Sequence, residues 1–191
     1  MQRLSQLLGV LLAALILSAC GQSNAAQPTH GGAETDHHSA AGQASSAPFD
    51  ARFIDGMIEH HRGAVTMAEQ ALQQSQRPEI TQMARTIIDT QQQEITQMTN
   101  WRAQWYPDLA PTGGTDTAMG DMSVSDDGST PYDQRFISAM IAHHNGAIEM
   151  ARAAQTQAEH AELRQLAATI ITAQQAEVVQ LEQWRGQWFG N

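Results

Sequence analysis

The sequence predicts an all-α protein, a four-helix bundle made of two tandem helical hairpins related by approximate two-fold symmetry. Ala, Gln and Met are abundant and aromatic residues make up only 5% of the chain, a composition that favours helices over strands. Residues 49–108 and 132–191 align without a gap at an offset of 83 with 28 identities, so one unit occurs twice. Each unit contains two stretches with helical hydrophobic periodicity.

The first segment, residues 1–19, is expected to be a lipoprotein signal peptide. Arg3 gives it a positive start, and the apolar stretch over 7–17 is too short to span a membrane comfortably. The sequence LSAC at 17–20 resembles a bacterial lipobox, in which the cysteine is lipidated and becomes the mature N-terminus. Cys20 is the sole cysteine, so we expect an exported lipoprotein anchored in the cell envelope, facing the periplasm or the cell exterior. A cleaved secretory signal and a retained membrane anchor are the alternatives.

Residues 20–48 are expected to form a flexible tether, because Gly, Ala, Ser, Gln and Pro dominate them without apolar periodicity. The tether contains His30, His37 and His38, which belong either to an ordinary polar linker or to a weak metal-catching tract. A second linker over 109–131 separates the repeats. Its Met119 and Met122 form a short motif that suits Cu(I).

Each repeat is expected to fold as two helices. In the first repeat they span about 50–75 and 79–105, with Pro78 in the first turn of the second helix. Asp50 and Asp133 are expected to be the N-caps of the first helices. The second repeat has Ala161 in place of Pro78, so its helix break is less clearly marked. One hairpin alone leaves its apolar stripe in water, so the two repeats are expected to pack together.

Composition also excludes several classes of function. The formal net charge is −10 and all ten basic residues are arginines, so no basic surface is available for nucleic acid. A single cysteine excludes an intramolecular disulfide framework and a cysteine-based zinc site. The chain shows no nucleophile–base pair, phosphate loop or general-acid pair, and we expect a protein that is not an enzyme.

The first helix of each repeat carries the residues with the clearest chemistry. At about 100° per residue, two histidines and two methionines fall on the apolar face of this helix in both repeats. Imidazole and thioether together form a soft ligand set that suits copper, Cu(I) in particular, with Cu(II) also accepted by imidazole. The pattern predicts two sites, or one shared site at the symmetry axis. The candidate metal ligands are Met57, His60, His61, Met67, Met140, His143, His144 and Met150.

The second helix of each repeat adds a carboxylate, Glu94 or Glu177, to an otherwise apolar face. Each carboxylate either accepts the free N–H of a ligand histidine and so sets its tautomer, or ligates the metal itself, or lies at the edge of the stripe and reaches solvent. The four tryptophans are expected to pack near the hairpin ends. The glutamines at 91–93 are expected on the helix surface.

The motif F-I-x-x-M-I-x-H-H-x-x-A-x-x-M-A occurs at 53–68 and at 136–151. It resembles the domain-of-unknown-function family 305 (DUF 305), and the resemblance covers essentially all of 49–191. The resemblance implies a ferritin-like four-helix bundle, export from the cell, and binding of copper in the context of copper resistance. It implies that the eight histidines and methionines named above are the copper-binding candidates.

Three functions therefore compete. The first is an exported copper-binding lipoprotein that sequesters or delivers copper and meets a copper-handling protein partner. The second is a non-metal scaffold whose histidines form hydrogen bonds across the core. The third is a di-iron oxidase of ferritin-like type, which the sequence disfavours because neither repeat contains Glu-x-x-His. The oligomeric state is left open.

Overall fold

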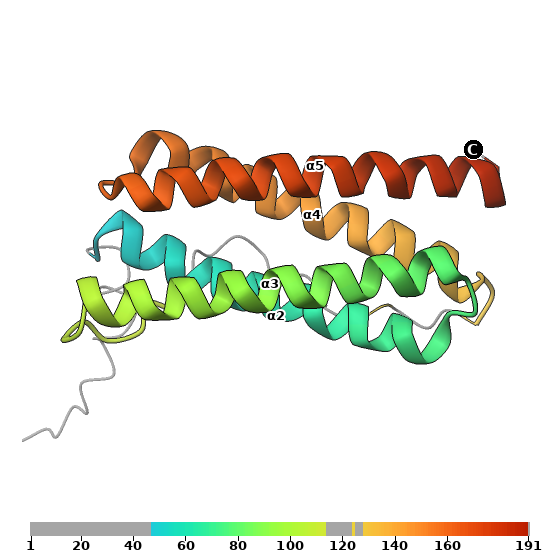
Figure 1. The fold of residues 1–191 in the computed structure, drawn as a ribbon, viewed down its shortest axis with the longest axis horizontal. Coiled ribbons are helices and arrows are strands. Elements are labelled where there is room, and N and C mark those ends of the chain that lie inside the picture. Colours follow the sequence, from blue (N-terminus) through green and yellow to red (C-terminus); the bar gives the residue numbers. More distant parts are fainter. Residues whose placement is uncertain (1–46, 114–123, 125–127, 191) are drawn as a thin grey trace, which may run out of the picture. The chain divides into compact units, whose positions relative to one another are not determined.

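The computed structural model describes residues 47–113, 124 and 128–190, all within one unit, His37–Asn191. These residues form four helices and no strand, which confirms the all-α fold (Figure 1). In the first repeat, α2 spans Phe49–Gln74 and α3 spans Pro78–Trp105. In the second, α4 spans Tyr132–Gln157 and α5 spans Ala161–Phe189. The second hairpin breaks at the position equivalent to that in the first, although it lacks the proline.

The two hairpins pack through their first helices. α2 contacts α3, α4 contacts α5, and α2 contacts α4, with α2 and α4 running in opposite directions (Figure 1). This arrangement buries the apolar faces in two clusters. One contains Phe53 and Met57 of α2 with Leu163 of α5, and the other contains Met67 of α2 with Phe136 and Met140 of α4. The central turns of the helices, between the two clusters, carry the histidines.

The sequence predicts that Asp50 and Asp133 cap the N-termini of their own helices, but in the structure neither of them does so. Pro48 and Pro131 occupy the two N-cap positions, and neither makes a side-chain cap hydrogen bond. Asp50 instead accepts hydrogen bonds from the backbone N–H groups of Glu159 and His160, each at 3.0 Å. The prediction was wrong because the hairpin of the other repeat brings the start of α5 against this carboxylate, where its free N–H groups need an acceptor.

At each end of the α2–α4 pair, an aspartate of one repeat contacts the turn of the other repeat, but the residue that it meets in that turn differs. His160 Nδ1 lies 2.7 Å from Asp50 Oδ2, and its ring stacks on Trp105 with centroids 3.7 Å apart. At the equivalent position Arg77 pairs with Asp133 at 3.2 Å and lies over Trp188, 4.2 Å from the ring centroid. We call these contacts the two latches, because each joins the turn of one repeat to the first helix of the other.

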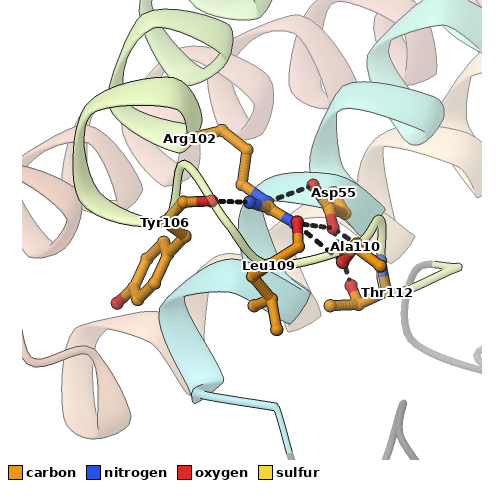
Figure 2. A network of polar contacts seen from close by, with 6 residues as sticks. All are labelled: Asp55, Arg102, Tyr106, Leu109, Ala110 and Thr112. Atoms are coloured by element: carbon orange, nitrogen blue, oxygen red, sulfur yellow. Dashed lines mark hydrogen bonds and ion pairs between the residues drawn. The ribbon is translucent and has the colours of Figure 1, made fainter.

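The chain leaves α3 through a tight polar network (Figure 2). The Arg102 guanidinium donates hydrogen bonds to Asp55 and to the carbonyl oxygens of Tyr106, Leu109 and Ala110. Asp55 Oδ2 also accepts from the backbone N–H and the hydroxyl of Thr112, each at 2.8 Å. Val124 then lies near the other end of α2, where its N–H meets Gln70 Oε1 at 3.4 Å. The described residues of the linker thus contact α2 at Asp55 and at Gln70.

Several expectations concern residues outside the described part of the chain: the signal peptide 1–19, lipidation of Cys20, the tether histidines, and Met119 with Met122. Within the described residues, no helix is both long enough and apolar enough to cross a membrane.

Candidate metal centre

The four paired histidines meet where α2 and α4 cross. The His60 and His143 rings lie with centroids 3.8 Å apart at an interplanar angle of 50°, and the centroids of His143 and His144 are 6.3 Å apart. His61 and His144 are fully buried, whereas His60 and His143 are partly buried. Equivalent histidines from the two repeats thus lie side by side at the symmetry axis.

Gly146 allows this close approach. A Cβ atom at position 146 would lie 3.1 Å from Nε2 of His60, which is tighter than an ordinary van der Waals contact. The glycine is part of the repeated motif, so the space for the opposing imidazole is encoded in the second repeat. Only the packing of α2 on α4 reveals which side chain uses that space.

Each buried histidine faces a carboxylate from the second helix of its own repeat. His61 Nε2 and Glu94 Oε2 form a hydrogen bond of 2.7 Å, and Glu94 is 9% exposed. His144 Nε2 and Glu177 Oε2 also lie 2.7 Å apart, but His144 Nε2 is not aligned for a hydrogen bond. The sequence allows three roles for Glu94. Its contact with His61 and its burial favour the role of hydrogen-bond acceptor over that of a solvent-exposed residue.

Most of the other imidazole nitrogens have no hydrogen-bond partner. In the described part of the chain, the buried nitrogens without one include Nδ1 of all four paired histidines and Nε2 of His143 and His144. A buried polar atom without a partner destabilises a fold by about 1–3 kcal/mol. Of these six atoms, His144 Nε2 lies 2.7 Å from the Glu177 carboxylate, and the other five are available to a ligand.

The environment keeps the neighbouring His60 and His143 rings uncharged. Burial, with a smaller contribution from His61 and His144, lowers the pKa of His60 from 6.5 to about 4. Burial, with a smaller contribution from His60 and the other imidazoles, lowers the pKa of His143 from 6.5 to about 2. Neutral imidazole is the form that binds metals, so both rings are ready to ligate at neutral pH.

Two glutamines in the second helices were missed by the sequence analysis. Gln91 and Gln174 occupy equivalent positions in the repeats, are each 3% exposed, and each has a buried Oε1 without a hydrogen-bond partner. The expectation that 91–93 lie on the surface is therefore wrong for Gln91, since α3 turns this residue inward one turn before Glu94. The available signal was its position on the helix, since Gln91 lies four residues after Ile87 and seven before Met98, both of which are buried.

The methionines lie on either side of the histidines. Met57 belongs to one apolar cluster, against which Met150 packs, and Met67 and Met140 belong to the other. Each cluster thus receives one candidate methionine from each repeat. The predicted ligands of one helix are therefore divided between the two clusters.

The described residues contain no group of three or more His, Cys, Asp or Glu side chains that could hold one metal ion. The unpartnered imidazole nitrogens and the flanking thioethers nevertheless fit a soft ion that accepts few nitrogen and sulfur ligands. The tryptophans lie at the hairpin ends, where Trp101 stacks on Trp105 and Trp184 on Trp188.

Comparisons with known proteins concern the family and the fold of the chain. A family model described as "Domain of unknown function (DUF305)" matches residues 18–102 and 50–185. No curated protein matches the sequence.

Several solved structures are similar to the chain. CopM in the Cu(I)-bound form is 36% identical with a TM-score of 0.64, covering 74% of this chain and 98% of that one. CopM in the Cu(II)-bound form is 38% identical with a TM-score of 0.65, covering 73% and 97%. A DUF305 protein from Streptomyces coelicolor, 22% identical with a TM-score of 0.62 over 73% and 93% of the two chains, shows the same fold.

Proposed function

We propose that this chain, which belongs to the DUF305 family, binds copper and sequesters or delivers it as an exported lipoprotein. The observation that carries the proposal is the set of buried imidazole nitrogens without hydrogen-bond partners at the α2–α4 crossing. Copper is the cargo, and the protein supplies ligands, orientation and a dry environment for it.

The donor types favour copper over harder cations. Mg²⁺ and Ca²⁺ prefer carboxylate and carbonyl oxygens, whereas Cu(I) prefers thioether sulfur and imidazole nitrogen. The residues at and beside the crossing are histidines and methionines from both repeats. The CopM structures with Cu(I) and Cu(II), at 36% and 38% identity, support the same assignment for this chain.

The contact of His61 with Glu94 assigns roles within the site. When His61 Nε2 carries the proton that Glu94 accepts, Nδ1 has the free lone pair, and this atom is buried without a partner. A carboxylate behind a ligand histidine sets its tautomer and makes it a stronger base. We therefore assign Nδ1 of His61 as a ligand atom and Glu94 as its positioning residue. His144 and Glu177 occupy the equivalent positions at the same 2.7 Å separation, without an aligned hydrogen bond.

The cellular setting is part of the proposal. Lipidation at Cys20 would tether the bundle to the envelope through the segment over 20–48, where exported proteins meet external copper. A copper-handling protein would be the donor or recipient. Mass spectrometry of the chain purified from membranes, testing for acylated Cys20, checks this part separately.

A non-metal scaffold is the second candidate. It is favoured by the lack of a ready three-residue His, Cys, Asp or Glu group among the described residues. In that case the histidines serve only to pair the repeats. Added copper would then leave the melting temperature unchanged, because only a ligand that binds the native state stabilises it.

A competition titration decides between the two. The chain is titrated against a Cu(I) chelator, and the double variant Met57→Leu with His61→Ala is compared with Met83→Leu with His160→Asn. The second variant changes a methionine and a histidine outside the candidate ligand set and keeps a side-chain N–H donor for Asp50. We expect the first variant to bind Cu(I) more weakly and the control to bind like the wild type. If the wild-type chain takes no copper from the chelator, the proposal fails.

A further inference from the structure

We propose that the groove between α3 and α5 is the route by which Cu(I) reaches the buried imidazoles, with Glu94 as the positioning residue at its inner wall. This inference rests on the proposed function, because it concerns how the same ion arrives. It adds residues of α3 and α5 that belong to no predicted ligand set.

The groove has a volume of about 460 Å³ and lies between the C-terminal half of α3 and the N-terminal half of α5. Glu94 and Trp101 line it from α3, and Glu162, Leu166 and Thr169 line it from α5. Threonine and glutamine side chains complete the wall, although more of the exposed lining surface is apolar than polar. Its lining contains two carboxylates and no arginine.

Glu94 connects this groove to the buried histidines. It lines the groove, its side chain is 12% exposed, and its Oε2 accepts the hydrogen bond of His61 Nε2 at 2.7 Å. His61 itself is fully buried, and its Nδ1 has no hydrogen-bond partner. An ion that moves along the groove therefore meets a carboxylate in direct contact with a candidate ligand.

Charge and aromatic surface both attract a cation here. Glu94 and Glu162 face the groove from opposite helices, and like charges lining a concave surface raise the local concentration of the opposite ion. Trp101, stacked on Trp105 with ring centroids 5.1 Å apart, adds a fixed aromatic wall that favours cations.

The contact at the inner wall links arrival to binding. A cation near Glu94 lies beside the carboxylate whose Oε2 accepts the His61 N–H, so a single side chain separates the groove from a candidate ligand.

Helix α5 itself supplies a matched test of the route. Thr169 lines the groove and Thr172 does not; both are exposed threonines of α5 whose hydroxyls bond the carbonyl four residues earlier. We compare Thr169→Trp with Thr172→Trp, and Glu162→Gln with Glu182→Gln, an exposed glutamate of α5 outside the groove lining. Transfer of Cu(I) from a coloured chelator to the full chain is followed by stopped flow, and affinity is measured separately at equilibrium.

We expect Thr169→Trp and Glu162→Gln to slow uptake about two- to fivefold, with the Glu162→Gln effect disappearing at high salt. Equilibrium affinity for Cu(I) should be unchanged in both variants, and the two controls should behave like the wild type. The tether is identical in every protein, so copper captured there contributes equally. Circular dichroism verifies folding, and Glu162→Gln carries the test if Thr169→Trp does not fold.

Three results would overturn the route. The first is wild-type uptake rates in both groove variants, and the second is equal slowing by Thr172→Trp and Thr169→Trp. The third is a loss of affinity at an unchanged rate, which would make the groove part of the site. In all three cases the wild-type chain still binds copper, so the proposed function stands, whereas a wild-type chain that takes no Cu(I) removes the proposed function together with the route.

Discussion

The side chain of Asp50, in the first turn of α2, accepts a hydrogen bond from His160 Nδ1 at 2.7 Å, across 110 residues of sequence. The same carboxylate accepts the backbone N–H groups of Glu159 and His160 and is 1% exposed. One buried aspartate of the first repeat thus accepts hydrogen bonds from two residues of the second, and so joins the two repeats.

Replacing Asp50 by Ala is therefore expected to destabilise the chain by about 2–4 kcal/mol, because several donors lose their acceptor together. Urea unfolding followed by circular dichroism measures the change in free energy of unfolding. Asp89→Ala serves as the control, since Asp89 is exposed on α3 and its removal should change stability by less than about 0.5 kcal/mol. Equal effects of the two substitutions would contradict the latch.

Gly146 should not tolerate a side chain. In Gly146→Ala the new Cβ would lie 3.1 Å from His60 Nε2, so the ring must move by a few tenths of an ångström. We expect weaker Cu(I) binding, measured by chelator competition. Thermal unfolding should show less stabilisation than at an open helical position, because the close contact opposes the helix propensity gained from alanine. Gly186→Ala, at an exposed position within α5, should instead stabilise by up to about 1 kcal/mol, because alanine is the better helix former.

Removing the Glu94 carboxylate should weaken copper binding without removing a candidate ligand. In Glu94→Leu the N–H of buried His61 loses its acceptor, which should destabilise the chain by about 1–3 kcal/mol and lower copper affinity about 10- to 100-fold. Long-range ¹H–¹⁵N NMR of the imidazoles reports the tautomer, which should be Nε2–H in the wild type and mixed in the variant. A wild-type His61 protonated at Nδ1 would refute this role.

Buried glutamine oxygens without a hydrogen-bond donor should limit stability. Replacing Gln91 and Gln174, each 3% exposed with an unpartnered Oε1, by Leu removes two buried unsatisfied oxygens. The free energy of unfolding of the metal-free chain should rise by about 1 kcal/mol per site. Gln92→Leu, at an exposed position, is the control and should have little effect. Destabilisation by Gln91→Leu would show that the amide makes a needed contact.

Acid should destabilise the metal-free protein below about pH 6.5. The pKa of His60 is about 4 and that of His143 about 2 in the folded chain, against 6.5 ordinarily. Between these values the unfolded state binds more protons than the folded state, so stability falls as the pH falls. The loss by pH 4 is of the order of 3 kcal/mol for each ring. Urea unfolding at a series of pH values should show a shallower slope for His60→Gln with His143→Gln than for the wild type.

Much of the fold was predictable because the information is local and is given twice. Helical periodicity and the gapless repeat predict four helices, and the structure has them. The histidines also lie inward, as the wheel indicates, with His61 and His144 fully buried. The expectation of an N-cap at Asp50 failed because capping rules consider neighbours in sequence, and the groups that this aspartate binds belong to the other repeat.

The sequence by itself determined the helices, the duplication and the set of histidines and methionines, because periodicity and residue type depend only on the order of residues. The tertiary structure decided which of them meet. Antiparallel packing of α2 on α4 places His60 against His143 and divides the methionines between two apolar clusters. The packing of the other helices buries Gln91 of α3 and forms a groove between α3 and α5 whose lining includes Glu94. Such contacts join residues far apart in the chain, so they follow from how helices pack and not from the period of any one helix.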